Sequence, residues 1–283
     1  MSRSSFENSG SLTAGVASRS WSTDSLAQAL GLRDQGELVS IVGGGGKSAA
    51  LFGLGASLPG QTLLTTTTRI FAAQTSRAAR SCSYGSTECQ VALRAGAGGL
   101  LVIGEIEGEK AKGVGREVPG LFLAAPGVDS VVVEADGSRM LPAKAPADHE
   151  PVLPDETTLL LVVAGIDALA GPIEETCHRP GRVSALVGLG RAEALGPADL
   201  SRLLCHPEGG LKGLPESSRA ALLINKVETA QEWTAARIVA GEALQCAGVD
   251  RVVLGALEPE APSGATGSLG RPVVQKLEVH ERG

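Results

Sequence analysis

Six consecutive residues of this chain have the composition of a loop that binds phosphate: Gly43-Gly44-Gly45-Gly46-Lys47-Ser48. They follow an apolar, β-rich run at 37–42 and precede a stretch of helical spacing at 48–58, which is the context that such a loop requires. Glycines let successive backbone N–H groups turn toward phosphate oxygens, and the N-terminus of the following helix adds partial positive charge. In this interpretation Lys47 reaches the β- and γ-phosphates of ATP or GTP, and the Ser48 hydroxyl ligates Mg²⁺.

The spacing is that of the short GxxGK[ST] loop, as in Mur-type ligases. The longer GxxxxGK[ST] pattern needs a glycine five residues before Gly46, and that position is Ile41. The alternative is a glycine-rich turn followed by an ordinary surface lysine, but four glycines and a Lys-Ser pair at a strand–helix junction favour phosphate binding. We expect Lys47 to be exposed on the loop, so that its removal would leave the fold intact.

Two carboxylates end a second apolar strand, predicted at 130–133, in the run Val133-Glu134-Ala135-Asp136. Open α/β sheets bind ligands at the carboxyl ends of their strands, and an acid at that position typically orients Mg²⁺ or water. Glu134 and Asp136 are therefore candidate catalytic residues on one face of the strand, and Glu134 is also a candidate metal ligand. The alternative is that Glu134 caps a turn or pairs with Arg139.

A threonine run ends another predicted strand, at 61–68. The hydroxyl of Thr66 could ligate Mg²⁺ or bond the γ-phosphate, and Arg69 could offset the charge that develops during phosphoryl transfer. Strand propensity alone explains the same threonines, since Thr is favoured in sheets.

The segment Asn225-Lys226-Val227-Glu228 follows an apolar strand predicted at 220–224 and resembles the NKxD element with which G-proteins read guanine. In that element a carboxylate accepts hydrogen bonds from two ring nitrogens. Here the acid is Glu228, one methylene longer than Asp, so the choice between ATP and GTP stays open. A strand-end turn that uses Asn is the alternative.

Three Pro-containing polar clusters lie in predicted loops, and loops carry function more often than core elements do. They supply candidate residues for a second substrate or a partner, although each cluster alone also fits a solvated turn: Lys144, His149, Glu150, His178 and Arg179. The Cys-His pairs at 177–178 and 205–206 match no standard zinc spacing, which disfavours a metal site built on cysteine.

Short, continuously apolar runs separated by helical stretches predict an α/β fold of the P-loop NTPase type, a mostly parallel sheet with helices on both faces. Further strands are predicted at 99–103, 157–164 and 251–254. The 283 residues are 43% hydrophobic but only 2% aromatic, so aliphatic side chains must fill the core. We divide the chain into a disordered tail at 1–21, a P-loop nucleotide-binding domain at 22–257, and a Pro/Gly-rich linker with a terminal edge strand at 258–283.

A net charge of −6 without a basic stripe disfavours nucleic acid as a partner. The five cysteines are scattered without a CxxC pair, which indicates reduced thiols and a cytoplasmic protein. No apolar run approaches the roughly 18 residues of a membrane span, so we expect no membrane partner. The first twenty residues hold seven serines and lack the apolar core of a secretory signal.

Taken together, these stretches resemble the selenium-dependent molybdenum hydroxylase accessory family of the YqeC type. The matching segments keep the family's order from about residue 24 to 257, and the specific ones beyond the generic phosphate loop are 134–138 (EADGS), 144–146 (KAP), 150–154 (EPVLP) and 178–180 (HRP). Ser48 and Glu228 stand where the family more usually has Thr and Asp. The resemblance implies a role in making or inserting a selenium-modified molybdenum cofactor, with a molybdenum hydroxylase or a cofactor-processing protein as partner.

Three functions are compatible with these features. The leading one is a Mg²⁺-dependent ATP or GTP hydrolase that drives a maturation step. The second is a small-molecule kinase or ATP-dependent ligase, in which Lys144, His149 and His178 would hold the acceptor. The third is a nucleotide-gated binding protein with almost no turnover. Nucleotide consumption that needs a partner protein would favour the first, consumption that needs a small acceptor would favour the second, and tight binding without consumption would favour the third.

Overall fold

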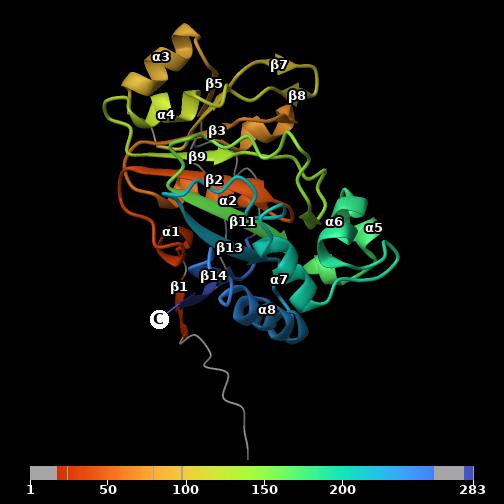
Figure 1. Ribbon diagram of the computed structural model, residues 1–283. Coiled ribbons are helices and arrows are strands. Elements are labelled where there is room, and N and C mark those ends of the chain that lie inside the picture. Colours follow the sequence, from red (N-terminus) through yellow and green to blue (C-terminus); the bar gives the residue numbers. More distant parts are fainter. Residues whose placement is uncertain (1–17, 24, 79, 97, 258–276, 283) are drawn as a thin grey trace, which may run out of the picture.

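A ten-stranded sheet forms the centre of the residues that the computed structural model describes, which are 18–23, 25–78, 80–96, 98–257 and 277–282 (Figure 1). Its strand order is β1-β15-β14-β13-β11-β2-β9-β3-β6-β5. The eight strands from β14 to β5 are parallel, and β15 and β1 continue the sheet in antiparallel pairing. The strands are β1 Ser18–Thr23, β2 Glu37–Gly43, β3 Thr62–Thr66, β5 Arg80–Ser83, β6 Leu100–Ile103, β9 Ser130–Glu134, β11 Leu159–Gly165, β13 Arg219–Asn225, β14 Arg251–Leu254 and β15 Leu277–Arg282. The mostly parallel α/β sheet is thus confirmed.

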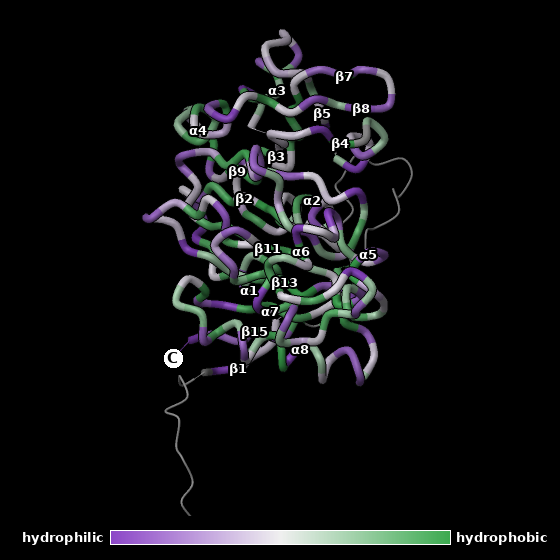
Figure 2. Tube along the Cα trace, turned by 45° about the vertical axis from the view of Figure 1, so that its right-hand side comes forward, coloured by the Kyte–Doolittle hydropathy of each residue, from purple (hydrophilic) through white to green (hydrophobic). Residues whose placement is uncertain are grey.

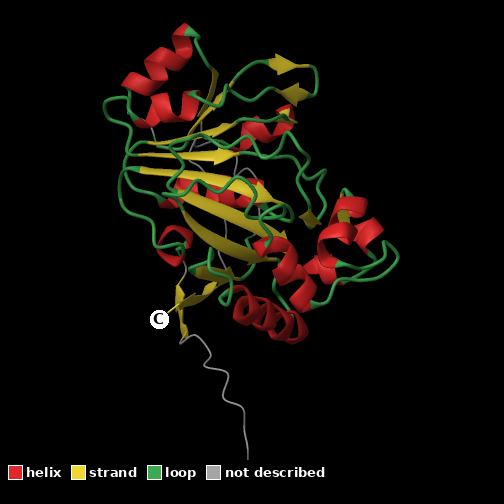
Figure 3. Cartoon of the chain, viewed as in Figure 1, coloured by secondary structure: helices red, strands yellow, loops and turns green. Residues whose placement is uncertain are grey.

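Helices cover both faces of this sheet, as predicted (Figure 3). Side chains alternate across a strand, so Leu38 and Val42 of β2 pack on one face while Val39 and Ile41 pack on the other. The first face is covered by α3 Thr87–Arg94, α4 Val118–Leu123, α6 Pro180–Val187, α7 Pro197–Cys205 and α8 Ala230–Ala243. The second face is covered by α1 Leu26–Ala29 and α2 Lys47–Ser57. The central strands are the most continuously hydrophobic part of the chain in Figure 2, as burial on both faces requires.

Strand β2 lies at the point where the direction of chain build-up reverses. After β2 the chain forms β3, β5, β6 and β9 on one side of it, and then β11, β13 and β14 on the other. Ligands of open α/β sheets bind outside the carboxyl ends of strands at such a reversal. The three strand ends that meet there are Gly43 of β2, Glu134 of β9 and Gly165 of β11.

Several short elements lie around these strand ends, and the sequence did not indicate them because they are too short to show periodicity. Strand β10 Ala143–Lys144 pairs in parallel with β12 Cys177–His178, after α5 Ile173–Thr176. A small antiparallel sheet joins β4 Ile70–Phe71, β7 Ile106–Glu107 and β8 Lys110–Ala111. The 3₁₀ helices are η1 Ala72–Arg77 and η2 Ile166–Leu169.

Both ends of the described chain meet at one edge of the sheet (Figure 1). Residues 18–21, which we had placed in the tail, belong to β1, and β1 rather than the C-terminal strand is the edge. The C-terminal strand pairs on both sides, with β1 and β14. The rest of the predicted tail and most of the predicted linker lie outside the described residues. Within the described part of the chain, no helix combines the length and apolar character needed to span a membrane.

Candidate functional site

The loop between β2 and α2 admits only glycine. A Cβ atom at Gly43 would lie 2.1 Å from the Val163 carbonyl oxygen, and one at Gly46 would lie 2.1 Å from the side-chain nitrogen of Asn225. The two glycines between them are crowded just as closely by backbone atoms. Gly43 and Gly46 also have φ angles of 98° and 147°, which side-chain-bearing residues rarely adopt. The four glycines are therefore explained by neighbouring strands that pack directly on the loop backbone.

The backbone N–H groups of this loop fall into two sets. Those of residues 43–45 donate to Asp136 Oδ2, the Val163 carbonyl and the Leu141 carbonyl over 2.8 to 3.1 Å, so the fold itself uses them. Those of residues 46–49 have no acceptor within the described part of the chain, and they form the open N-terminal turn of α2. At the predicted phosphate-binding loop, only the backbone N–H groups of residues 46–49 are therefore available to a phosphate group.

Lys47 is buried, contrary to our expectation of an exposed loop lysine, with 4% of the residue accessible. Its Nζ donates to the Gly43 carbonyl at 2.8 Å and lies 3.3 Å from Asp136 Oδ1 and 3.8 Å from Glu134 Oε1. The physical reason is that these two strand-end carboxylates offset the cost of burying its charge. Strand β9 ends at Glu134, so Asp136 lies beyond the strand and does not share a strand face with Glu134, although both acids converge on this lysine.

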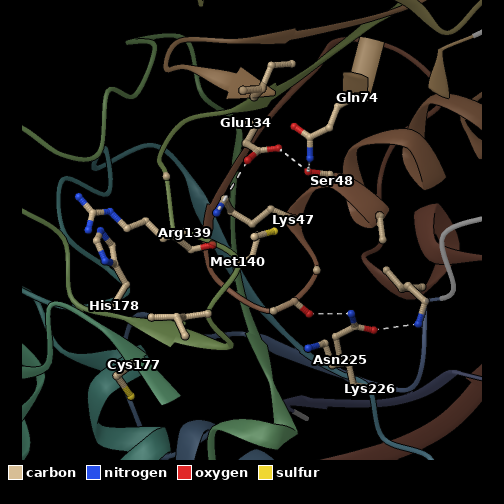
Figure 4. Close-up of a pocket in the computed structure, with 18 of the residues that line it drawn as sticks. Lys47, Ser48, Gln74, Glu134, Arg139, Met140, Cys177, His178, Asn225 and Lys226 are labelled. Atoms are coloured by element: carbon tan, nitrogen blue, oxygen red, sulfur yellow. Dashed lines mark hydrogen bonds and ion pairs between the residues drawn. The ribbon is translucent and has the colours of Figure 1, made fainter. Parts of the chain in front are cut away.

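Ser48 and Glu134 lie side by side at the start of α2 (Figure 4). Ser48 Oγ donates to Glu134 Oε2 at 3.1 Å and accepts from Gln74 Nε2 at 3.1 Å. Burial raises the pKa of the Glu134 carboxyl group, and the negative charge of Asp136 raises it further. The positive charge of Lys47 and the hydrogen bond from Ser48 lower this pKa, but burial has the larger effect.

These oxygens fit Mg²⁺. A hydroxyl and a carboxylate are ligands it prefers, and it usually takes only one or two protein ligands and completes its shell with water and substrate phosphates. Asp136 Oδ1 adds a buried carboxylate oxygen without a hydrogen bond in the described residues, although it lies 3.3 Å from the Lys47 ammonium. No group of three His, Cys, Asp or Glu side chains in the described ranges could hold a metal by itself, so Mg²⁺ would depend on the phosphates of a ligand.

A chain of alternating charges extends from Lys47 through Asp136, Lys144 and Glu150 to Arg179. Lys144 Nζ lies 2.9 Å from Asp136 Oδ2 and 2.6 Å from Glu150 Oε2. Arg179 donates to both oxygens of Glu150, at 2.8 and 3.0 Å. Burial by itself raises the pKa of Glu150, but hydrogen bonds from Arg179 and Lys144 outweigh it and bring the pKa to about 2. The pairing of β10 with β12 thus joins the polar clusters of the sequence to the phosphate loop.

A cavity of about 1170 Å³ opens beside the loop (Figure 4). Seven cationic side chains and four acidic ones are among the described residues that line it: Lys47, Arg69, Arg77, Lys110, Arg139, Arg179 and Lys226, against Glu134, Glu150, Glu174 and Glu228. The chain as a whole has a net charge of −6. A cavity of opposite sign indicates an anionic ligand, because local potential concentrates counter-ions.

Backbone strain is concentrated at this cavity. The non-glycine residues with positive φ in the described ranges are Arg139, Met140, Arg179 and Lys226, and all four line it. Arg139 and Met140 occupy the middle of the turn 138–141, where two successive positive φ angles usually require Gly, Asn or Asp. Such strain persists where the surrounding structure enforces it, and it clusters at functional sites.

Most of the predicted site residues meet at the cavity. Its lining includes Gly45, Gly46, Lys47, Ser48, Arg69, Glu134, Glu150, His178, Arg179, Asn225, Lys226 and Glu228. Asp136 and Lys144 are buried behind that lining. Thr66 and His149 lie elsewhere: the Thr66 hydroxyl is buried and donates to the Glu134 carbonyl at 2.9 Å, and His149 is exposed outside the cavity. The geometry therefore gives no support to Thr66 as a metal ligand or to His149 as an acceptor-binding residue.

Asn225 connects the loop to the end of β14 (Figure 4). Its Nδ2 donates to the Gly45 carbonyl and its Oδ1 accepts from the Leu257 N–H, both at 2.8 Å, so its side chain has a structural task. Lys226 Nζ lies 2.6 Å from Asp167 Oδ2. Glu228 is exposed at the cavity rim. Within the segment 225–228, its carboxylate is therefore the group that is available to contact a nucleotide base.

Five lining residues with charged or amide side chains were not among the predicted site residues: Gln74, Arg77, Lys110, Arg139 and Glu174. Gln74 and Arg77 belong to η1, and Arg77 lies 4.7 Å above the Phe52 ring. Burial lowers the pKa of Arg77, which the charge of Glu134 opposes. All of these residues follow a predicted strand end by less than about a dozen residues, so a wider search after those ends would have found them.

Comparison with known proteins places the chain in a family. The family described as "YqeC protein" matches residues 39–181. The chain is 29% identical to "Uncharacterized protein YqeC" of Escherichia coli (strain K12) over 201 residues, which cover 70% of this chain and 78% of that relative. No solved structure matches the chain. The matched region contains the phosphate loop, both strand-end acids and the Lys144–Glu150–Arg179 ion pairs, and the chain belongs to the YqeC family.

Proposed function

We propose that this chain binds ATP or GTP with Mg²⁺ at the loop 43–48 and hydrolyses it or transfers its γ-phosphoryl group. The single observation that carries the proposal is the hydrogen bond between Ser48 and Glu134 at the open amide end of α2, inside a cationic cavity. Free amides, a loop lysine, a hydroxyl and a strand-end acid are the parts that phosphoryl transfer requires.

Each part has a separate task in this mechanism. The amides of 46–49 and Lys47 hold the β- and γ-phosphates, and Lys47 reaches them by leaving its hydrogen bond to the Gly43 carbonyl. Ser48 and Glu134 hold the metal or a water attached to it, and when Mg²⁺ is bound it neutralises charge on the phosphate oxygens. Arg69 and Arg77 line the same cavity and can offset charge that develops on the transferred group.

The biological setting of the proposal is maturation of a selenium-dependent molybdenum hydroxylase or of its cofactor. It rests on the family resemblance of the EADGS, KAP and HRP segments, which the ion pairs of Asp136, Lys144, Glu150 and Arg179 unite beside the loop. A molybdenum hydroxylase or a cofactor-processing protein is the proposed partner.

The alternative function, a small-molecule kinase or ligase, is favoured by the size of the cavity. About 1170 Å³ exceeds the roughly 300 to 1,000 Å³ typical of a site for one small ligand. The space beyond a nucleotide would then hold an acceptor.

Calorimetric titration with Mg²⁺·ATP and Mg²⁺·GTP tests the binding step. Lys47→Ala should weaken the preferred nucleotide by roughly tenfold or more, since it removes a charge-assisted contact. Lys112→Ala is the matched control, because that lysine pairs with acids of the β7–β8 hairpin outside the cavity lining. As Lys47 is buried, Ser48→Ala provides a second test that leaves the buried charges in place: it should reduce the Mg²⁺ dependence of binding. If both variants bind both nucleotides as the parent does, the phosphate-loop assignment is wrong.

A further inference from the structure

One side of the cavity carries positive charge that the phosphate loop does not use. In Figure 4 the side chains of Arg139 and His178 lie on one side of Lys47, and Ser48 and Gln74 lie on the other. Arg139 is exposed and makes no hydrogen bond or ion pair with any residue in the described ranges. Its backbone is held in a strained left-handed conformation at a φ angle of 51°. An unpaired guanidinium at a cavity wall is a ready anion ligand.

The His178 ring lies beside this arginine and also makes no hydrogen bond within the described part of the chain. Burial lowers its pKa, the positive charges of Arg179, Lys144 and Arg139 lower it further, and Glu150 opposes them, which leaves the pKa at about 4. The imidazole is therefore neutral at pH 7 and offers one donor and one acceptor nitrogen to a ligand.

Arg179 is a third residue on this side of the cavity, and its side chain is held in place by Glu150. Two hydrogen bonds to Glu150 fix its guanidinium, yet 23% of the side chain is still accessible. Its left-handed backbone, at a φ angle of 61°, starts α6 directly after His178. The two arginines thus approach the cavity from different elements, one after β9 and one after β12.

We propose that Arg139, His178 and Arg179 form a second anion-binding subsite, which takes a small phosphorylated acceptor while a nucleotide occupies the phosphate loop. The inference rests on the proposed function, because the nucleotide must fill the other part of the cavity. Arg139 supplies the unpaired positive charge, and Arg179 supplies a second positive charge that Glu150 holds in place. His178 accepts a hydrogen bond from a hydroxyl group next to the anion.

The test uses the full chain saturated with Mg²⁺ and a non-hydrolysable ATP or GTP analogue, whichever binds. Inorganic sulfate is titrated as a probe of a phosphate dianion, and calorimetry should detect one sulfate bound per chain in addition to the nucleotide. Arg139→Gln should weaken sulfate roughly tenfold or more without changing nucleotide affinity, because a charge-assisted contact is lost. Arg182→Gln is the matched control: this arginine pairs with the exposed Asp148 outside the cavity lining, so sulfate affinity should be unchanged.

A second readout isolates His178. A bound anion raises the pKa of a neighbouring imidazole, so the protein should take up protons when it binds sulfate near pH 6. In calorimetry, this uptake makes the measured heat of sulfate binding depend on the ionisation enthalpy of the buffer. His178→Gln should abolish that uptake, and His149→Gln, on the exposed histidine, should keep it.

Sulfate that only displaces the nucleotide analogue, or an additional site indifferent to Arg139→Gln, would overturn the subsite. Proton uptake that survives in His178→Gln would remove the histidine from it. Failure of both nucleotide analogues to bind is a different result, because it removes the proposed function itself.

Discussion

The Lys144 ammonium group lies 2.9 Å from Asp136 Oδ2, and both side chains are buried. Asp136 also accepts the Gly43 N–H at 3.0 Å, so this ion pair fixes the start of the phosphate loop relative to β10. Each charge has one further counter-ion, Lys47 at 3.3 Å from Asp136 and Glu150 at 2.6 Å from Lys144, so removal of one partner leaves the other only partly compensated. The position of the loop backbone thus depends on a residue a hundred positions away in sequence.

We expect Asp136→Asn and Lys144→Met each to lower the free energy of unfolding by about 1 to 3 kcal/mol, less than for a buried charge left alone, because Lys47 and Glu150 remain as counter-ions. The double variant should lose less than the sum of the two, since the Asp136–Lys144 contact is lost only once. Denaturant unfolding of the four proteins measures this coupling. The exposed pair Arg182–Asp148, 2.8 Å apart, serves as the comparison and should contribute about 0 to 1 kcal/mol. Equal coupling in the two pairs would show that burial of Lys144 has no energetic consequence.

Glu134 should make Mg²⁺ binding dependent on pH. Burial raises its pKa, and Mg²⁺ binds the ionised carboxylate, so the affinity for Mg²⁺ in the presence of nucleotide should rise with pH through that raised pKa and then level off. Glu134→Gln should remove this dependence, keep nucleotide affinity within a few fold, and lower turnover by roughly two to four orders of magnitude.

Turnover should be measured with the partner or acceptor present, because a maturation NTPase can be nearly idle alone. Asp136→Asn is the informative comparison: Asp136 is buried behind the cavity lining, so its loss should act through stability and loop position. A parent-like turnover rate in Glu134→Gln would exclude this acid from the chemistry.

Glu150 should stabilise the fold most at neutral pH and lose that effect in acid. Its pKa is about 2 in the folded chain against 4.5 for an unperturbed Glu, so between these values the unfolded state binds more protons and stability rises with pH. Glu150→Gln should therefore cost about 1 to 3 kcal/mol near pH 7, with allowance for partial solvent exposure, and the difference should shrink as the pH falls toward 2. Urea unfolding of both proteins from pH 2 to 7 measures the difference. Glu216→Gln, on an exposed loop, is the control and should show none.

The sequence predicted the elements whose signal is local. Mostly apolar runs predicted strands β2, β6, β9, β11, β13 and β14 to within a few residues, because strands buried on both faces are rich in apolar residues, and a run rich in Leu and Thr predicted β3. Glycines followed by Lys47 and Ser48 predicted the loop, because close backbone approach demands glycine.

The sequence could not predict which polar side chains are buried or which groups they contact, because both depend on which strand ends meet. The burial of Lys47 follows from two acids that arrive on β9, and the commitment of the Thr66 hydroxyl follows from the pairing of β3 with β9. The sequence suggested Arg139 only as an ion-pair partner of Glu134, for a related reason: its importance comes from a strained turn and an unpaired charge at a cavity, and neither leaves a composition signal.

The segment 225–228 should decide which nucleotide base the chain prefers. Asn225 uses both ends of its side-chain amide on backbone groups of Gly45 and Leu257, which leaves Glu228 at the rim as the carboxylate that can read the base. If Glu228 accepts two hydrogen bonds from guanine, GTP should bind more tightly than ATP, because adenine would leave the carboxylate unpaired. Exposure at the rim limits the preference to about 1 to 2 kcal/mol, since water can replace a lost bond there.

Competition of ATP against GTP in calorimetry, with Glu228→Ala beside the parent, measures this preference. The substitution should bring the two affinities together, whereas Glu242→Ala, on an exposed position of α8, should leave the ratio unchanged. Asn225→Ala should instead weaken both nucleotides alike, because it loosens Gly45 and thereby the loop that holds the phosphates. Equal affinities for ATP and GTP in the parent, unaffected by Glu228→Ala, would mean that residues 225–228 form only a structural turn.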